Sequence, residues 1–262
     1  MLPEVTIIIP THNMGYTLEK AINSILSQQY PSFEVIVMDD GSTDNTKSLV
    51  ETHFNNSYLR YLFQKRGGRA SALNKAITES KGRYVSFLDA DDTLTEDSLE
   101  KRVSYLKTHP EKDAVFADTN FVDKKGKIYD VRRPTCLDHQ DLILEFLAGP
   151  RGPFHPLSLM YRRVVFNKVS FNPPMKRRED TDFVIRLLQE CSVGYLPHTI
   201  YNHTVGTHGC FNRLGNRLIS LSNLFTIIQN YETTPSQKFN LYSKAFLFET
   251  LKFFYEIFWY KK

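Results

Sequence analysis

The sequence predicts an α/β protein with a mostly parallel central sheet and helices on both faces of that sheet. The first observation is an alternation that runs to about residue 120. Short runs of β-branched and aromatic residues alternate there with segments whose apolar residues repeat at helical spacing. Strands separated by helices form βαβ units, and the strands of such units are parallel. The second observation is that polar clusters follow several of the strands, where open α/β sheets bind ligands.

The first two strands and the helix between them have clear signals. Residues 5–9 form a β-branched run that ends at Pro10, as expected for a buried strand. Residues 33–38 are mostly apolar and are expected to form a second strand, followed by the turn-forming segment DDGSTDNT. The helix between them is indicated by apolar residues three and four positions apart: Leu18, Ile22, Ile25 and Leu26. Pro31 is expected to end this helical segment.

The alternation then continues. Further strands are expected at 58–62, 84–88 and 114–117, where apolar runs recur. The accompanying helices are indicated by three sets of apolar residues: Leu49 and Val50; Ala70, Leu73, Ala76 and Ile77; Leu99, Val103 and Leu106. The last helix is expected to begin near Thr93, because Thr93 and Glu96 have the spacing of a capping box.

The second half of the chain has weaker signals. From about residue 123 the segments DKKGK and GPRGPFHP are loop-like and rich in Gly, Pro and basic residues. A strand is expected at 157–161 and a helix at 182–191. The segment 239–262 predicts a further helix, with aromatic residues around much of its circumference. We therefore expect a C-terminal helical segment beyond the sheet.

The composition limits the functional classes. The 262 residues are 41% hydrophobic and 24% charged, as in a folded rather than a disordered protein. A net charge of +4 mildly favours anionic ligands, and nucleic acid is not an expected partner. Three widely spaced cysteines indicate neither a zinc site nor a disulfide framework. With no basic leader and no apolar run of about 18 residues, we expect a cytoplasmic protein.

The stretch SFLDADDT, residues 86–93, places three carboxylates directly after a predicted strand. In an extended chain Asp89 and Asp91 share a face and lie about 7 Å apart, so a modest turn lets both approach one cation. Oxygen ligands suit Mg²⁺ or Mn²⁺. The alternative is a helix N-terminus, where acidic residues meet the positive end of the dipole. That alternative accounts for Asp92 but not for the Asp89–Asp91 pair.

The stretch resembles motifs of two enzyme classes. One is the haloacid dehalogenase-type phosphatases, in which Asp89 would be the nucleophile. The other is the nucleotide-sugar glycosyltransferases of the GT-A fold, in which the pair binds a cation on the donor diphosphate. The phosphatase motif normally belongs to the first strand of its core, whereas two α/β units precede it here.

The segment VTIIIPTHNMGYTLEKAINSILSQQYPSFEVIVMDDGSTDNT closely resembles the N-terminal half of the family 2 inverting glycosyltransferases. The resemblance continues through GGRASALNKAITESKGRYVSFLDADD. It is strong over residues 4–120 and patchier to about residue 215. It implies a GT-A fold with a Rossmann-like central sheet. Two positions depart from the family pattern: His12 replaces the usual Tyr, and Leu73 stands where an Arg often precedes the Asn. Arg69 could serve in place of that Arg.

The resemblance implies a donor site that binds a nucleoside-diphosphate sugar together with Mn²⁺ or Mg²⁺. Asp40 would accept a hydrogen bond from the base, in particular the imide N–H of uracil; the alternative is an Asx turn or a helix cap. Asp89 would lie near the ribose or a metal-bound water and share the metal with Asp91. The remaining expected nucleotide-binding residues are Pro10, Thr11, Asn13 and Arg69.

A transferase also needs a base that deprotonates the acceptor hydroxyl. The segment KRREDTDFVIRLL resembles the family's Glu-Asp motif at the start of a helix. It implies that Asp180 is the general base and that Glu179 orients the acceptor or the base. The alternative is a pair of acids that only caps the helix. A non-catalytic sugar-nucleotide-binding module is the rival hypothesis outside enzymes.

The resemblance also implies an organisation of the chain. We expect a glycosyltransferase domain at 1–215, with a nucleotide-sugar-binding half at 1–122 and an acceptor-binding half at 123–215. A helical extension follows at 216–262. The expected acceptor is a hydroxyl of a glycan or a lipid-linked sugar, as in surface polysaccharide synthesis. The helical extension could pack on the domain, form a homodimer or contact a membrane surface from the cytoplasmic side.

Two further features are left open. His203 and His208, in YNHTVGTHG, could contact a metal or a phosphate, but a solvent-facing loop is the favoured interpretation. The basic clusters could bind phosphates of a lipid-linked acceptor or lie in solvated loops: Arg132 and Arg133, Arg162 and Arg163, and Lys176 to Arg178.

Overall fold

The computed structural model describes residues 2–54, 57–148, 152–205, 214–231 and 234–259. Within them, nine strands form one sheet in the order β3-β2-β1-β4-β8-β6-β9-β5, and β7 pairs with β6. The strands are β1 Val5–Thr11, β2 Phe33–Asp40, β3 Leu59–Gln64, β4 Tyr84–Phe87, β5 Thr93–Leu94, β6 Ala114–Val122, β7 Ile128–Arg132, β8 Met160–Arg162 and β9 Val193–Thr204. The α-helices are α1 Gly15–Leu26, α2 Thr46–His53, α3 Arg69–Glu79, α4 Ser98–Thr108, α5 His139–Ala148, α6 Glu179–Glu190, α7 Leu214–Asn230 and α8 Pro235–Trp259. Two 3₁₀ helices, Pro156–Ser158 and Arg163–Asn167, flank β8.

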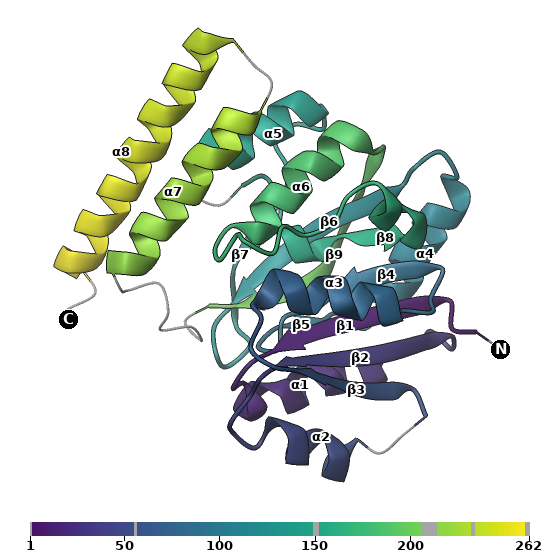
Figure 1. Ribbon diagram of the computed structural model, residues 1–262. Coiled ribbons are helices and arrows are strands. Elements are labelled where there is room, and N and C mark those ends of the chain that lie inside the picture. Colours follow the sequence, from purple (N-terminus) through teal and green to yellow (C-terminus); the bar gives the residue numbers. More distant parts are fainter. Residues whose placement is uncertain (1, 55–56, 149–151, 206–213, 232–233, 260–262) are drawn as a thin grey trace.

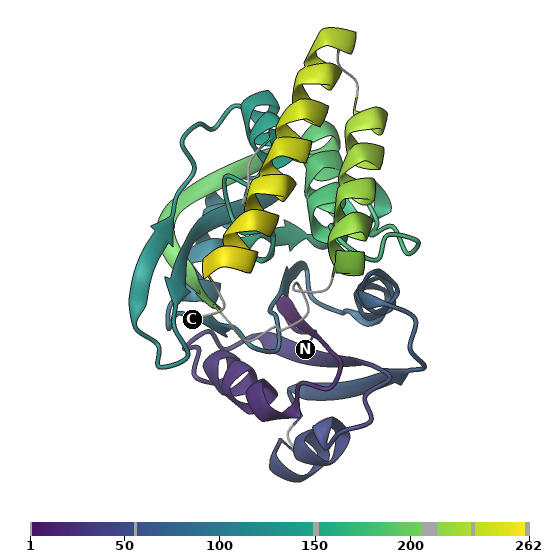
Figure 2. The same ribbon diagram turned by 90° about the vertical axis from the view of Figure 1, so that its left-hand side faces the viewer.

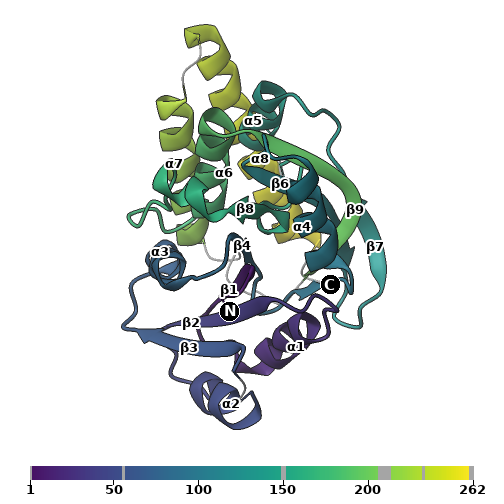
Figure 3. The same cartoon turned by 90° about the vertical axis from the view of Figure 1, so that its right-hand side faces the viewer.

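The N-terminal half is a parallel βαβ sheet. Strand β1 pairs in parallel with β2 and with β4, and β2 pairs in parallel with β3. Helices α1 and α2 lie on one face and α3 lies on the other (Figure 3). All residues of β1 are buried, since helices cover both faces. This half confirms the predicted α/β class and the predicted order of its elements.

The C-terminal half adds antiparallel pairs to the sheet. Strand β8 pairs antiparallel with both β4 and β6, and so joins the two halves of the sheet. Strands β6 and β9 pair in parallel over most of their length, and the short β5 pairs antiparallel with the end of β9. Helices α7 and α8 lie side by side beyond the sheet (Figures 1 and 2), and α8 packs on α5.

The structure corrects two predictions about these elements and contains a long strand that was not predicted. The helix after DADD begins at Ser98 rather than near Thr93, because residues 93–94 form β5 and pair with β9. The expected strand at 157–161 is a 3₁₀ turn followed by β8. The 12-residue strand β9 was not predicted. Its central Pro197 and its polar residues hide a β pattern that only pairing with β6 makes visible.

The guanidinium of Arg102 is fully buried beside the sheet, close to the DADD segment. Arg102 on α4 donates from Nη1 to the hydroxyl of Ser86 on β4 at 2.7 Å. It also donates from Nε and Nη2 to the carbonyl and hydroxyl of Ser98. Burial lowers the pKa of Arg102 to about 9. These hydrogen bonds compensate the buried charge and tie α4 to the strand that leads into Asp89.

The two halves are also joined by a side chain. The amide group of Asn74 on α3 accepts from the N–H of Phe171 at 3.0 Å and donates to the carbonyl of Phe171 at 2.9 Å. This pairing fixes the segment that leads into α6 against the N-terminal half. Across the described helices, none combines the length and apolar character that a membrane span requires.

Candidate active site

The ends of β1 and β2 form one hydrogen-bonded unit. Asn13 adopts a left-handed backbone conformation with a φ of 53°. Its Oδ1 accepts from the N–H of Thr43 at 2.7 Å, and its own N–H donates to the hydroxyl of Ser42 at 2.8 Å. The expected nucleoside-binding residue Asn13 is therefore tied to the DDGSTD turn, so that the two motifs lie against each other. Pro10 and Thr11 are buried at the end of β1, and the hydroxyl of Thr11 has no partner among the described residues.

Asp40 holds the loop between β3 and α3. Its Oδ1 accepts from the N–H of Gly67 at 2.7 Å and from the side chain of Gln64 at 2.8 Å. Its Oδ2 accepts from the N–H of Gly68 at 3.0 Å and pairs with Arg66 at 3.1 Å. Both carboxylate oxygens are thus used within the protein. The predicted contact with a base would be an additional role for a side chain that already positions the segment before Arg69.

The DADD segment brings three carboxylates together at the end of β4. Carboxylate oxygens of Asp89, Asp91 and Asp92 lie within 4.8 Å of one another. Asp91 is 6% exposed, and the side chain of Asp89 is 21% exposed. An all-oxygen set at this spacing fits a hard divalent cation such as Mg²⁺ or Mn²⁺. The expected pair is therefore present in a suitable arrangement, with Asp92 beside it.

Asp92 does not begin a helix, so that interpretation is wrong. Its side chain is fully buried and accepts from the hydroxyl of Tyr201 and from the N–H of Thr204, each at 2.7 Å. It also accepts from Nδ1 of His203 at 3.1 Å. These partners lie on β9, about 110 residues along the chain. Because β5 pairs with β9, Asp92 points into the sheet rather than toward a helix N-terminus.

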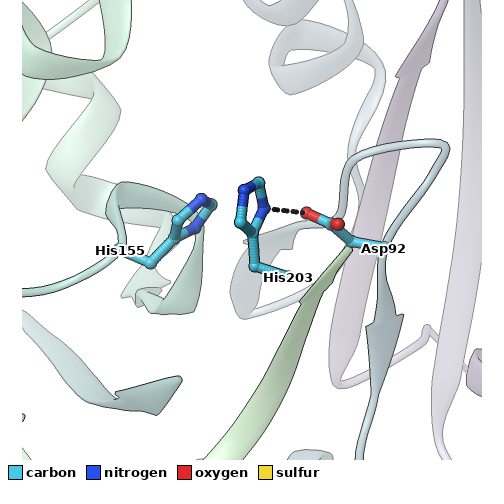
Figure 4. Close-up of side chains that lie close together, drawn as sticks. All are labelled: Asp92, His155 and His203. Atoms are coloured by element: carbon cyan, nitrogen blue, oxygen red, sulfur yellow. Dashed lines mark hydrogen bonds and ion pairs between the residues drawn. The ribbon is translucent and has the colours of Figure 1, made fainter. Parts of the chain in front are cut away.

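His203 lies between Asp92 and His155 (Figure 4). The expectation that it faces solvent in a loop is wrong, because it belongs to β9 and its side chain is 28% exposed. Burial lowers the pKa of His203, but the hydrogen bond and charge of Asp92 raise it more, so the net shift is upward. The ring centroids of His155 and His203 are 4.7 Å apart, and burial lowers the pKa of His155 well below 6.5. His208 lies outside the described residues.

Asp92, His155 and His203 also form a group with metal-ligand atoms within 4.8 Å. The position of His155 and the role of Asp92 were not predicted from the sequence. Their only local signals are a histidine in a Pro-rich loop and the third Asp of DADD. In the structure Nδ1 of His203 is engaged by Asp92, so the group is an internally hydrogen-bonded cluster beside the Asp89–Asp91 pair.

Arg69 connects this cluster to the start of α6. Its Nη2 lies 2.6 Å from Oδ1 of Asp89, and its Nη1 lies 3.8 Å from Oε1 of Glu179. Burial lowers the pKa of Arg69, but the nearby carboxylates, Asp89 first and Glu179 second, raise it more. One guanidinium thus brings together the start of α3, the end of β4 and the start of α6.

Glu179 and Asp180 form the first turn of α6, as predicted. Glu179 is 9% exposed, and burial, together with the charge of Asp180, raises its pKa, although Arg69 opposes the shift. Asp180 is partly exposed and accepts from the N–H of Thr181 at 2.7 Å. An acidic pair with one protected and one accessible carboxylate can orient a hydroxyl group and accept its proton.

Residues 6–170 match the family model described as glycosyl transferase family 2. A Rickettsia bellii relative described as an uncharacterized glycosyltransferase is 31% identical over 194 residues, which cover 73% of this chain and 28% of that relative. The Bacillus subtilis protein named "Putative teichuronic acid biosynthesis glycosyltransferase TuaG" is 28% identical over 200 residues, covering 74% of this chain and 75% of that protein. The chain spans between 28% and 62% of the length of the Rickettsia relatives that it matches.

Solved structures resemble the chain over nearly its whole length. S. aureus TarS 1–349 in complex with UDP-GlcNAc has a TM-score of 0.69 at 20% identity, covering 97% of this chain and 73% of that one. The mannosyltransferase PcManGT from Pyrobaculum calidifontis, in complex with GDP-Man and Mn²⁺, has a TM-score of 0.65 at 25% identity, covering 94% and 70%. These likenesses confirm the GT-A fold. Because the family model covers more than half of the chain, the chain belongs to glycosyl transferase family 2, as its motifs predict.

Proposed function

We propose that the chain is a metal-dependent, inverting glycosyltransferase that moves a sugar from a nucleoside-diphosphate sugar to an acceptor hydroxyl. The observation that carries this proposal is the convergence at Arg69. The guanidinium contacts Asp89 of the candidate cation pair and lies 3.8 Å from Glu179 of the candidate catalytic pair. Donor phosphates and acceptor hydroxyl must meet within a few ångströms for transfer, and this arrangement brings together the residues that would serve each of them.

The donor is proposed to be linked to UDP. Asp40 accepts from the imide N–H of the base, and Pro10, Thr11 and Asn13 line the nucleoside edge. Arg69 faces the diphosphate. Support for uridine comes from TarS, a structural neighbour whose complex contains UDP-GlcNAc. PcManGT, whose complex contains GDP-Man, makes guanosine the alternative to be tested.

Asp89 and Asp91 are proposed to hold Mn²⁺ or Mg²⁺. Their carboxylate oxygens, together with those of the nearby Asp92, suit a hard cation. The complex of the structural neighbour PcManGT contains Mn²⁺. When bound, such an ion supplies Lewis-acid stabilisation of the negative charge that develops on the departing nucleoside diphosphate. Asp89 and Asp91 would hold this ion, and the guanidinium of Arg69 would add positive charge beside them.

Asp180 is proposed to be the general base and Glu179 to orient it or the acceptor. The acceptor oxygen forms a bond to the anomeric carbon, while the bond between that carbon and the phosphate oxygen breaks. The electron pair leaves with the diphosphate, and the hydroxyl proton passes to the Asp180 carboxylate. A single in-line displacement of this kind inverts the anomeric configuration.

The acceptor is proposed to be a glycan or a lipid-linked sugar at the cytoplasmic side of a membrane, as in surface polysaccharide synthesis. The relative TuaG, whose name refers to teichuronic acid biosynthesis, supports this class of acceptor. The proposed organisation is a donor half at 1–122, an acceptor half at 123–215 and a helical extension at 216–262. Exposed aromatic and aliphatic side chains on α8, such as Phe239 and Phe246, support a peripheral membrane contact or a homodimer.

The stereochemistry of the product tests the proposal. With an α-linked uridine donor, NMR of the anomeric proton should show a β-linked product; a retained configuration would reject the displacement mechanism.

A thermal-shift screen of nucleoside diphosphates and their sugars, with and without Mn²⁺, tests the donor. If guanosine compounds alone gave a metal-dependent shift, the uracil assignment of Asp40 would be wrong. If a phosphate mimic formed a stable adduct with the carboxylate of Asp89, the chain would instead be a phosphatase.

A further inference from the structure

The segment immediately before the Glu179–Asp180 pair has a strained backbone. Arg178, the N-cap residue of α6, has φ 59° and ψ 22°, a left-handed conformation that L side chains other than Asn and Asp rarely adopt. Such a conformation persists only where surrounding contacts determine it. The backbone geometry of Arg178 sets the direction in which α6 begins. The contacts that hold Arg178 therefore also set the positions of the first carboxylates of α6.

Among the contacts of this segment are two hydrogen bonds to side chains of α7. The guanidinium Nε of Arg178 donates to the hydroxyl of Ser220 at 2.9 Å. The side-chain amide of Asn223 donates to the carbonyl of Arg177 at 2.9 Å. Ser220 and Asn223 are three residues apart and therefore share one face of α7. Ser220 is 9% exposed, so its bond to the guanidinium is largely shielded from water.

Helix α7 is itself well anchored. Leu224, Ile227 and Ile228 are buried, and α7 packs along α8, which packs on α5 (Figure 1). The family model ends at residue 170, so α7 lies beyond the region that defines the family match. A helix outside that region thus contacts Arg177 and Arg178, the two residues that precede the Glu179–Asp180 pair.

We propose that α7 positions the catalytic pair, with Ser220 and Asn223 as positioning residues that act through Arg178 and Arg177. This inference rests on the proposed function of Glu179 and Asp180. Apart from Arg69, which lies on α3, the donor-binding candidates are on the other half of the sheet, at the ends of β1, β2 and β4. Loss of the α7 contacts should therefore disturb proton transfer from the acceptor and leave donor binding unchanged. A base that is displaced by a fraction of an ångström loses much of its effect on turnover.

The experiment uses the full chain with the double variant Ser220→Ala/Asn223→Ala. The matched control is Ser222→Ala/Thr226→Ala, which truncates two polar residues of α7 that line the groove toward α8. We expect the double variant to lower kcat at least tenfold and to change the Kd for the donor less than twofold. The control should change neither. Ser220→Thr, which retains the hydroxyl, should keep at least half of the wild-type kcat when Asn223 is present.

Amide hydrogen exchange provides a measurement that does not depend on catalysis. The N–H of Asp182 donates to the carbonyl of Arg178 at 2.9 Å and reports on the first turn of α6. Peptides covering residues 177–183 should exchange at least tenfold faster in the double variant, while peptides covering β1 exchange as in the wild type. Equal exchange in the double variant and the control would overturn the inference, as would a parallel loss of kcat and donor affinity. If the wild type transferred no sugar, the proposed function would fail, and the exchange result alone would decide whether α7 positions this segment.

Discussion

The Nη2 atom of Arg69 lies 2.6 Å from Oδ1 of Asp89, an ion pair that joins the start of α3 to the end of β4. The other amino group of the same guanidinium lies 3.8 Å from Glu179 on α6. The start of α3, the end of β4 and the start of α6 therefore meet at the guanidinium of Arg69. Removing the charge of Arg69 should therefore change the electrostatic environment of both carboxylates. This effect can be measured without knowledge of the substrates.

Replacement of Arg69 by Gln should raise the pKa of Glu179 above its wild-type value. Burial and Asp180 already raise this pKa, and Arg69 is the group that opposes them. Carbon-13 NMR of labelled Glu side chains measures the titration directly. Arg60→Gln is the control, because Arg60 pairs with Glu34 and Glu79. An unchanged or lower pKa of Glu179 in Arg69→Gln would contradict the structure.

The variant Glu179→Gln should change how stability depends on pH. Because the folded-state pKa of Glu179 lies above 4.5, the folded protein keeps a proton that the unfolded chain has already lost. The contribution of this group to the free energy of unfolding therefore falls as pH rises from about 4 to the folded pKa, and is constant above it. Relative to the wild type, Glu179→Gln should gain stability over this window. Urea unfolding between about pH 4 and 7 measures this difference in stability. The control variant is Glu190→Gln, which changes an exposed carboxyl group of the same helix.

Asp180→Asn should lower kcat by about 100-fold or more, because a positioned general base contributes roughly 10²–10⁴ to the rate. The matched control is Asp182→Asn, two residues further along α6, where Asp182 pairs with Arg186 at 2.6 Å. That control should retain kcat within about threefold, because an Asn can still accept from the guanidinium. Initial-rate kinetics, together with the melting temperature of each variant, separate catalysis from folding. Near-normal turnover by a folded Asp180→Asn protein would remove Asp180 from the mechanism.

Asp91→Asn should abolish the dependence of donor binding on Mn²⁺. The substitution keeps the shape of the side chain but removes the charge that an oxygen-ligated cation needs. Calorimetric titration of the donor with and without Mn²⁺ should show equal, weak affinities for this variant. Asp97→Asn removes a carboxylate that is 39% exposed and pairs with His198, so it should bind the donor as the wild type does. Retained metal dependence in Asp91→Asn would place the cation elsewhere.

Asp92→Ala should destabilise the protein by about 3 kcal/mol, because it leaves buried donors without an acceptor. The hydroxyl of Tyr201, Nδ1 of His203 and the N–H of Thr204 all donate to Asp92. Asp97→Ala, which breaks an exposed pair, should cost less than about 1 kcal/mol. Denaturant unfolding of the two variants gives the comparison. A loss of similar size in both would show that Asp92 lies in a solvated environment after all.

The N-terminal half could be predicted from the sequence because its signals are local. Residues 5–9 and 33–38 are almost entirely buried and mostly apolar, with Thr6 hydrogen-bonded to Glu34, and the helix between them shows a clear apolar stripe. The DADD segment could be placed at a strand end for the same reason. Glu179 and Asp180 were placed at a helix start because the apolar residues that follow them recur at helical spacing.

The role of Asp92 could not be predicted, because its partners are distant in sequence. A local capping pattern, Thr93 with Glu96, favoured a helix there. Pairing of β5 with β9 overrides that preference, since it buries Leu94 and brings Tyr201 and His203 to the carboxylate. The two-residue β5 and the mixed-polarity β9 are stabilised by their neighbours in the sheet, so both have little signal of their own.

The sequence by itself determined the α/β class, the family and the motifs whose carboxylates follow the strands, because these depend on local periodicity and on residue types at fixed spacing. The tertiary structure alone decided which distant groups meet: Arg69 with Asp89 and Glu179, Asp92 with His203, and Arg178 with Ser220. These contacts compensate charges and polar groups that are partly or fully buried. Strand pairing and helix packing bring these partners together across about 20 to 110 residues of chain, and no local pattern records them.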